Sequence, residues 1–257
     1  MGGIGDAITR FAARQRRKAL ATRLFDAHGG VVARGPFRGL RLERHANISR
    51  GPLGLKICGL YEAGVVDEIA AAAPIGDLVN FGAADGYMAL GPLVAGLAQR
   101  SICFELTATG REAIARAAAA NGLADRVVLR GAADAGTADA LREAGFVPER
   151  ALVLCDIEGA EFEVLDAGLL AALAPARLIV ELHDNPARNG TAAREALIAR
   201  LPAGSRHRIL SAGPVDWRGV PDLAALPDTD RALVMSEGRR FAGEWLVAEL
   251  GPRPAAG

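Results

Sequence analysis

Short apolar runs alternate with longer helix-like segments from residue 77 to residue 201. Runs such as 152–155 and 178–180 are apolar throughout, which is typical of parallel strands covered on both faces of a sheet. The repeated order of strand and helix predicts an α/β fold with a doubly wound, mostly parallel sheet. The predicted strands are 77–82, 101–105, 126–131, 151–156 and 177–182, and the predicted helices are 86–99, 109–122, 136–145, 159–173 and 191–201.

The segments before residue 77 predict an extension that packs on this core. Residues 6–27 combine apolar positions with many arginines. We interpret them as an amphipathic helix docked on the domain with a solvated arginine face, in preference to a helix that binds a membrane or an anionic partner. Residues 31–42 predict two short strands around Gly35-Pro36, and residues 60–73 predict a helix.

The alternation stops after residue 201. The runs 206–212 and 232–237 predict two strands with no helix between them, which would form an antiparallel hairpin at the edge of the sheet. The expected organisation is an N-terminal extension at 1–73, a core domain at 74–250 and a frayed tail at 251–257.

Composition limits the partners and the compartment. The 30 basic and 30 acidic residues balance, so charge gives no argument for a nucleic-acid partner. Cys58, Cys103 and Cys155 lack C-x-x-C spacing and adjoin apolar residues, which predicts buried reduced thiols in a cytoplasmic protein. No apolar run approaches the length of a membrane span.

A turn of small residues joins the first predicted strand to its helix. Glycines permit a sharp turn and the close approach of a ligand, and the following helix offers unpaired N–H groups. A dinucleotide site would place its third small residue at Tyr87, whereas small residues at 82, 84 and 86 fit the pattern of S-adenosylmethionine sites. Such a turn is also common in other α/β domains. The residues assigned to the cofactor here are Asn80, Gly82, Ala83, Ala84, Asp85 and Gly86.

The next two strand ends complete the predicted cofactor site, because ligands bind at the carboxyl ends of parallel strands. Glu105 ends the second strand, where a carboxylate is expected to accept from ribose hydroxyls. Ala133 and Asp134 follow the third strand and suit an adenine slot, although Asp134 is nearly as well explained as a turn residue.

The fourth and fifth strand ends carry the candidate catalytic residues, Asp156, Glu158 and His183. Adjacent strand ends place Asp156 near Glu181 and His183, and a histidine beside a carboxylate is a plausible general base for a hydroxyl. Asp156 is also assigned to the cofactor. Asp156, Glu181, His183 and Asp184 offer ligands for a divalent metal, but the spacing does not demand one and no metal is assigned. Glu161 and Glu163 are interpreted as solvent-facing residues of the next helix.

These motifs together resemble FkbM-like S-adenosylmethionine-dependent methyltransferases. The matching pieces include Tyr61-Glu62, the stretch 79–87, Phe104-Glu105, the block 154–161 and the strand end 179–183, within residues 35–185. The resemblance implies a class I methyltransferase fold and methyl transfer, usually to a hydroxyl oxygen of a sugar or secondary metabolite. The family usually has Asp where this chain has Asn80.

Two other functions are weighed against this one. A nicotinamide-dependent oxidoreductase would also use Glu105, but Tyr87 and the C-terminal hairpin argue against it. A non-catalytic binding or interaction module with a degenerate site has its best support in Asn80. We therefore expect S-adenosylmethionine as cofactor and a small-molecule acceptor as partner, with neither nucleic acid nor a membrane span.

Overall fold

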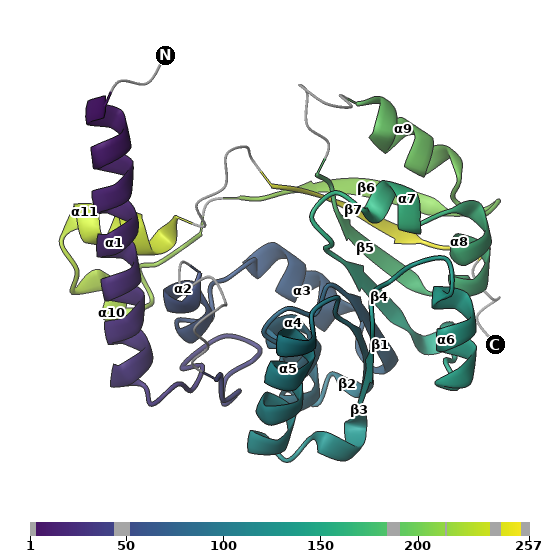
Figure 1. Cartoon of the computed structure of the whole chain (residues 1–257), viewed down its shortest axis with the longest axis horizontal. Coiled ribbons are helices and arrows are strands. Elements are labelled where there is room, and N and C mark those ends of the chain that lie inside the picture. The colour runs from purple at the N-terminus through teal and green to yellow at the C-terminus, as the bar shows by residue number, and fades with distance from the viewer. Residues whose placement is uncertain (1–3, 44–51, 184–190, 214, 237–242, 253–257) are drawn as a thin grey trace.

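A mixed β-sheet forms the centre of the computed structural model, which describes residues 4–43, 52–183, 191–213, 215–236 and 243–252 (Figure 1). Within these ranges the strand order is β3-β2-β1-β4-β5-β7-β6. The strands β1 to β5 are parallel, and β7 is antiparallel to both β5 and β6. The strands are β1 (Ile75–Phe81), β2 (Ala98–Phe104), β3 (Val127–Arg130), β4 (Leu152–Cys155), β5 (Arg177–Glu181), β6 (Arg206–Ser211) and β7 (Glu244–Glu249).

This sheet confirms the predicted doubly wound fold, and its two faces explain the apolar strands. Successive side chains of a strand point to opposite faces. In β4, Leu154 belongs to one core cluster and Val153 to the cluster on the other face, and all four residues of the strand are buried. A strand with two buried faces has no polar side, which is why its sequence shows no alternation.

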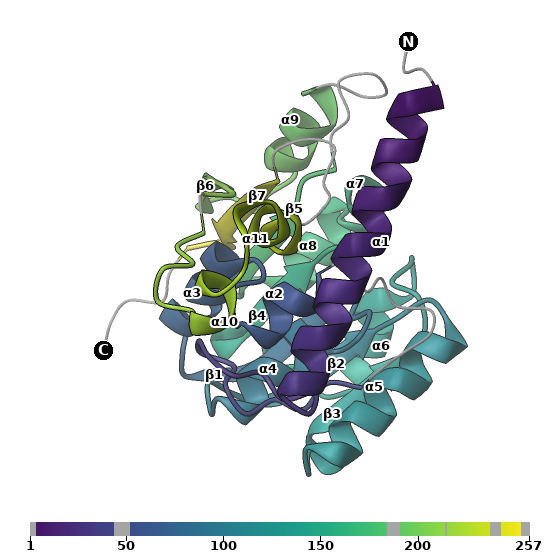
Figure 2. The same ribbon diagram turned by 90° about the vertical axis from the view of Figure 1, so that its left-hand side faces the viewer.

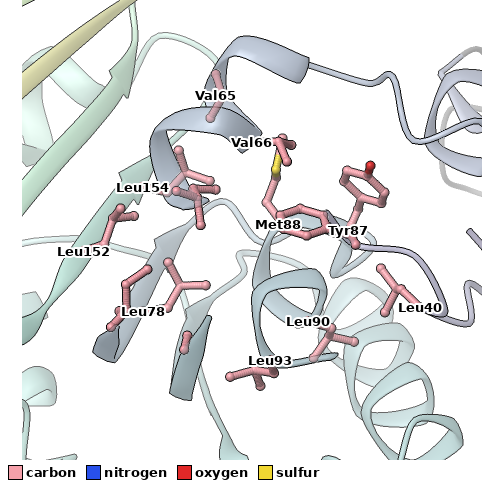
Figure 3. Packing of buried hydrophobic residues seen from close by; sticks show 14 of the residues in the cluster. Leu40, Val65, Val66, Leu78, Tyr87, Met88, Leu90, Leu93, Leu152 and Leu154 are labelled. Atoms are coloured by element: carbon pink, nitrogen blue, oxygen red, sulfur yellow. The ribbon is translucent and has the colours of Figure 1, made fainter. Parts of the chain in front are cut away.

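Helices cover both faces. One core cluster joins the sheet to α3 (Ala63–Ala71), α4 (Tyr87–Val94) and α5 (Ala108–Ala120), and Figure 3 shows side chains of α3 and α4 beside the strand residues Leu78 and Leu154. The other cluster joins it to α6 (Thr137–Glu143), α7 (Glu161–Val164), α8 (Ala167–Leu173) and α9 (Ala192–Ala199). The prediction of one helix over 159–173 was wrong, because the Asp166 side chain accepts from Leu169 N at 2.7 Å and caps the separate helix α8.

The N-terminal helix α1 (Ile4–Ala27) packs through its second half. Leu20 and Leu24 are buried in a cluster with residues of α10 (Pro221–Ala224) and α11 (Asp228–Met235), beside α2 (Leu53–Ile57). Figures 1 and 2 show the first half of α1 extending past these helices. The guanidinium of Arg16 contacts the Asp230 carboxylate at 2.5 Å.

Two further local predictions were wrong. Residues 31–42 form only an isolated antiparallel bridge between Val31 and Arg41, because the backbone of this segment turns at glycines with positive φ and the Ala33 N–H donates to Ile57 O instead. The apolar run from residue 232 belongs to α11, where Val234 is buried against α1 and acidic residues in the first turn favour a helix N-terminus.

The antiparallel partner of β6 is therefore β7, which lies between β5 and β6. The predicted antiparallel arrangement at this edge is correct, but its second strand lies further along the chain than 232–237. Residue 237 and most of the predicted tail, 253–257, lie outside the described residues. Among the helices that the structure describes, none is long and apolar enough to cross a membrane.

Candidate active site

The turn between β1 and α4 lies against the end of β4. Gly82 has φ +84°, and a Cβ at this position would lie 1.8 Å from the Asp156 carbonyl oxygen, so only glycine permits this contact. Ala84 and Gly86 also have positive φ, at 47° and 81°. Ala83 is buried, whereas Ala84 is exposed at the turn. Asn80 is buried within β1.

Glu105, at the end of β2, is tied to this turn. Its Oε2 accepts from the Ala84 N–H at 3.2 Å, and its Oε1 accepts from the backbone N–H and the hydroxyl of Thr107 at 2.9 and 2.7 Å. The side chain is only half-buried. The acid that was predicted to hold ribose thus lies directly beside the glycine turn, and its ligand role stays a prediction.

Asp134, after β3, shapes the start of α6. Its Oδ1 accepts from the Gly136 N–H at 2.8 Å, and its own N–H donates to the Thr137 hydroxyl at 2.7 Å. Asp134 is exposed and the preceding Ala133 is half-buried. The turn interpretation of Asp134 is therefore borne out by its hydrogen bonds, and its adenine role stays a prediction.

Lys56 contacts the glycine turn at Asp85, and a role for it was not predicted. Its ammonium contacts Asp85 Oδ2 at 2.5 Å, while Asp85 Oδ1 accepts from the Tyr87 N–H at 3.1 Å. The Lys56 Nζ also lies 4.7 Å from the ring centroid of Tyr61 and 5.4 Å from that of Tyr87. The sequence feature that could have indicated this contact is the lysine inside the apolar run 53–57, because a buried charge needs a partner.

The environment of Tyr61 shows that this region is both buried and acidic. Burial raises the pKa of the Tyr61 hydroxyl well above its ordinary value, and the charge of Glu62, a hydrogen bond to Glu62 and the charges of Asp156 and Asp85 raise it further. Glu62 is buried with φ +46°, a backbone conformation that side chains rarely adopt. Tyr61 and Glu62 directly precede α3, and the Tyr61 ring lies 5.7 Å from that of Tyr87, which follows the glycine turn.

His183 and three carboxylates meet at the ends of β4 and β5. The His183 Nε2 lies 3.8 Å from Asp156 Oδ1, 3.7 Å from Glu158 Oε2 and 3.9 Å from Glu181 Oε1. The His183 and Asp156 side chains are 24% and 30% exposed, and that of Glu158 is 91% exposed. The structure thus brings together the three predicted catalytic residues, and each of them is at least partly exposed.

The prediction that Glu161 faces solvent was wrong. Glu161 is completely buried, and its Oε1 accepts from both the backbone N–H and the Nδ1–H of His183 at 3.0 Å. Its Oε2 accepts from the Gly159 N–H at 2.8 Å. Glu161 begins the short helix α7, which ends at Val164. Because the sequence predicted one long helix here, the spacing along it gave the wrong direction for the Glu161 side chain.

The contact between Glu161 and His183 determines which ring nitrogen of His183 can accept a proton. Burial alone would raise the pKa of Glu161, but hydrogen bonds from His183 and its own backbone, with the His183 charge, lower it overall. Burial alone would lower the pKa of His183, but its hydrogen bond to Glu161 and the charges of Glu161, Asp156 and Glu158 raise it overall. Ionised Glu161 only accepts hydrogen bonds, so Nδ1 keeps its proton and neutral His183 has its lone pair on Nε2.

The same residues could hold a cation. Asp156, Glu158 and His183 each offer a ligand atom, and these atoms lie within 4.8 Å of one another. This set replaces the group weighed from the sequence, which included Glu181 and Asp184, and Asp184 lies outside the described residues. A histidine that donates its other ring nitrogen to a carboxylate suits a metal ligand as well as a general base.

We assign neither a metal-binding nor a catalytic role to the three cysteines. Cys58, Cys103 and Cys155 are free and buried, as predicted. Burial raises the pKa of the Cys58 thiol to about 12 and that of Cys103 to about 11, so thiolates do not form near neutral pH.

The sheet and the placement of the glycine turn identify the fold. Parallel strands in the order β3-β2-β1-β4-β5 continue into an antiparallel β7 that lies inside a terminal β6, and the turn follows the central β1. The fold is that of the class I S-adenosylmethionine-dependent methyltransferases. A dinucleotide-binding fold would have a parallel strand where β7 lies.

Comparison with known proteins gives no closer assignment. No protein-family model and no curated protein matches the chain. Among solved structures it is similar to the B. subtilis m1A22 tRNA methyltransferase TrmK, with 18% identity over 73% of this chain and 65% of that one, at a TM-score of 0.45. It is also similar to an O-methyltransferase from Bacillus cereus in complex with SAH, with 11% identity over 71% of this chain and 76% of that one, at a TM-score of 0.48. The resemblance to FkbM-like enzymes stays a prediction.

Proposed function

We propose that the chain is an S-adenosylmethionine-dependent methyltransferase that methylates a hydroxyl oxygen of a small acceptor, such as a sugar or a secondary metabolite. The observation that carries this proposal is the contact of the glycine turn with the end of β4. Gly82 touches the Asp156 backbone, and the Asp156 side chain in turn faces His183 Nε2. Residues that we expect to bind the cofactor thus lie beside a potential base.

The residues present fit the cofactor. The turn at 82–86 has no room for a Cβ at Gly82, and it presents the exposed Ala84 beside the half-buried acid Glu105. A carboxylate at the end of β2 suits the paired hydroxyls of a ribose. Bound S-adenosylmethionine would supply an electrophilic methyl group. Gly82, Ala84, Gly86, Glu105 and the loop 133–134 would hold it.

His183 would receive the proton of the acceptor. The Nδ1–H donates to Glu161, so the lone pair of Nε2 is the basic site, and it faces the partly exposed surface at Asp156 and Glu158. The two carboxylates would accept hydrogen bonds from further hydroxyls of the acceptor. A compound with adjacent hydroxyls, such as a sugar, matches this patch of acceptor groups better than an apolar compound does.

The packing of Tyr87 gives support against the oxidoreductase. Its ring is 2% exposed, and it packs edge to face with Phe37 and Tyr61 at centroid distances of 5.3 and 5.7 Å. A dinucleotide site needs a small residue here so that the helix can approach the strand. Asn80 remains the feature that favours a binding module.

Binding and product analysis test the proposal together. Calorimetric titration of the purified chain with S-adenosylhomocysteine and with NAD should show binding of the first alone, and Glu105→Ala should weaken it. Incubation with labelled S-adenosylmethionine and a panel of sugars and hydroxylated metabolites, followed by mass spectrometry, should give an O-methylated product.

The controls separate the alternatives. Binding of NAD instead would support the oxidoreductase, and binding of neither compound would support the module. Loss of turnover with EDTA that added Mn²⁺ restores would assign the cluster of Asp156, Glu158 and His183 to a metal rather than to a free base. Arg142→Gln is a suitable control variant, because the Arg142 side chain is 75% exposed and, within the described residues, forms an ion pair with Asp139 on the same helix.

A further inference from the structure

We infer that Lys56 and Asp85 form a receptor for the amino acid end of the cofactor, in which Lys56 binds its carboxylate and Asp85 binds its ammonium group. The inference rests on the proposed function. It assigns a binding role to α2, a segment that the glycine-turn motif does not include, and it names the part of the ligand that this segment recognises.

The pair is buried and lies on the glycine turn. The side chains of Lys56 and Asp85 are 8% and 13% exposed, and Nζ contacts Oδ2 at 2.5 Å. Asp85 is a residue of the turn, between Ala84 and Gly86, and α4 begins two residues after it. A charged lysine is thus brought from a segment 29 residues earlier to the turn where the cofactor is expected.

Each charge is also held in place by groups other than its partner. Asp85 Oδ1 accepts from the Tyr87 N–H, so the carboxylate would keep its position if Lys56 turned to a ligand. Lys56 lies over the rings of Tyr61 and Tyr87, which attract a cation. Both groups are therefore oriented before a ligand arrives, which reduces the entropy lost on binding.

A buried ion pair needs a reason beyond stability. Removing two charges from water costs as much as their attraction returns, and apolar residues of similar volume often replace such pairs without loss. An α-amino acid carries one carboxylate and one ammonium on the same carbon, and a pair of opposite charges is complementary to it. When the ligand binds, the Lys56–Asp85 contact would be replaced by two contacts, Lys56 with the ligand carboxylate and Asp85 with the ligand ammonium. Every charge would thus have a partner both with and without the ligand.

The experiment compares two ligands that differ in this end alone. S-adenosylhomocysteine has the amino acid group, and 5′-methylthioadenosine lacks it but keeps the adenosine and the sulfur. Both are titrated by calorimetry into wild-type protein and into Lys56→Met. We expect the variant to bind S-adenosylhomocysteine about 10- to 100-fold more weakly, the loss of one charged hydrogen bond, and to bind methylthioadenosine like the wild type.

A second variant protects the test against misfolding. Asp85→Asn keeps an oxygen that accepts from the Tyr87 N–H, and it should also weaken S-adenosylhomocysteine selectively. The matched control is Arg100→Met, which breaks the Arg100–Asp77 pair at 2.8 Å and the hydrogen bonds from Arg100 to the Ala144 and Gly145 carbonyls, near the start of β1 and away from its carboxyl end. It should leave both affinities unchanged at a comparable cost in melting temperature.

The outcomes distinguish a failure of the proposed function from a failure of this inference. If the wild type binds neither ligand, the proposed function fails and this inference fails with it. If the wild type binds both and the Lys56 and Asp85 variants weaken them equally, or weaken neither, the pair is structural and only this inference is overturned.

Discussion

Glu161→Gln is the most informative single change, because one buried carboxylate orients the candidate base. The wild-type Oε1 accepts two hydrogen bonds from His183, and Oε2 accepts one from Gly159. Gln keeps the shape but offers one oxygen and one NH₂ group. If the oxygen faces His183, the NH₂ faces the Gly159 N–H, so two donors oppose each other; the side chain at 161 is fully buried, whereas Gly159 is exposed.

The cost follows from these contacts. Two hydrogen bonds lose their charged acceptor, which weakens each by about 1 kcal/mol, and an unsatisfied buried donor costs about 1–3 kcal/mol. We therefore expect the free energy of unfolding to fall by about 3–5 kcal/mol, a large part of the 5–15 kcal/mol that is typical of domains. Denaturant titration measures it. Glu163→Gln, two residues along the same helix and exposed, should change it by less than about 0.5 kcal/mol.

The effect depends on pH with a definite sign. The pKa of Glu161 is lowered from 4.5, so its stabilising contribution is present above that value and is lost as the pH falls through the lowered pKa. The pKa of His183 is raised from 6.5, so its contribution is present below 6.5 and is lost as the pH rises through the raised pKa. The difference between wild type and Glu161→Gln should thus be greatest between these two limits.

The same change should move the titration of the base. Without the Glu161 charge the pKa of His183 falls, which proton NMR of its ring measures directly. As a free base, neutral His183 is the active form, so turnover by the wild type should rise with pH through its raised pKa, and the rise should shift to lower pH in Glu161→Gln. Unchanged stability together with an unchanged His183 pKa would refute the orientation of His183 by Glu161.

Two further predictions concern His183 as the base and the packing of α4, the helix that follows the glycine turn. His183→Ala should lower kcat by about 10²- to 10⁴-fold while the affinity for S-adenosylhomocysteine stays at the wild-type value; equal loss of both would indicate a structural role. Gly91→Ala should destabilise the protein by about 1–3 kcal/mol in denaturant titration, because its Cβ would lie 2.3 Å from the Phe37 ring. Gly64→Ala is its control, since a Cβ in α3 meets only Leu210 at 3.7 Å and should be neutral or stabilising; equal effects of the two changes would contradict the packing argument.

The sequence was sufficient wherever the signal was local. The apolar strands, the turn with small residues at 82, 84 and 86 and the acids at the strand ends follow from short patterns, since strand and helix periods and glycine turns depend on neighbouring residues. Because parallel strands present their carboxyl ends at one edge, these patterns also placed Asp156 beside His183, which the structure confirms at 3.8 Å.

Contacts between distant segments required the tertiary structure. The apolar run of α11 resembles a strand by composition, but burial of Val234 against α1 makes it a helix, and β7 then pairs between β5 and β6. Lys56 meets Asp85 and Glu161 meets His183 only after the chain has folded, because no local period relates a short helix to a loop or a strand end. The sequence by itself determined the parallel strands and the end of them where the candidate site lies, and the packing of their connections decided the antiparallel part of the sheet and which charges face each other at that site.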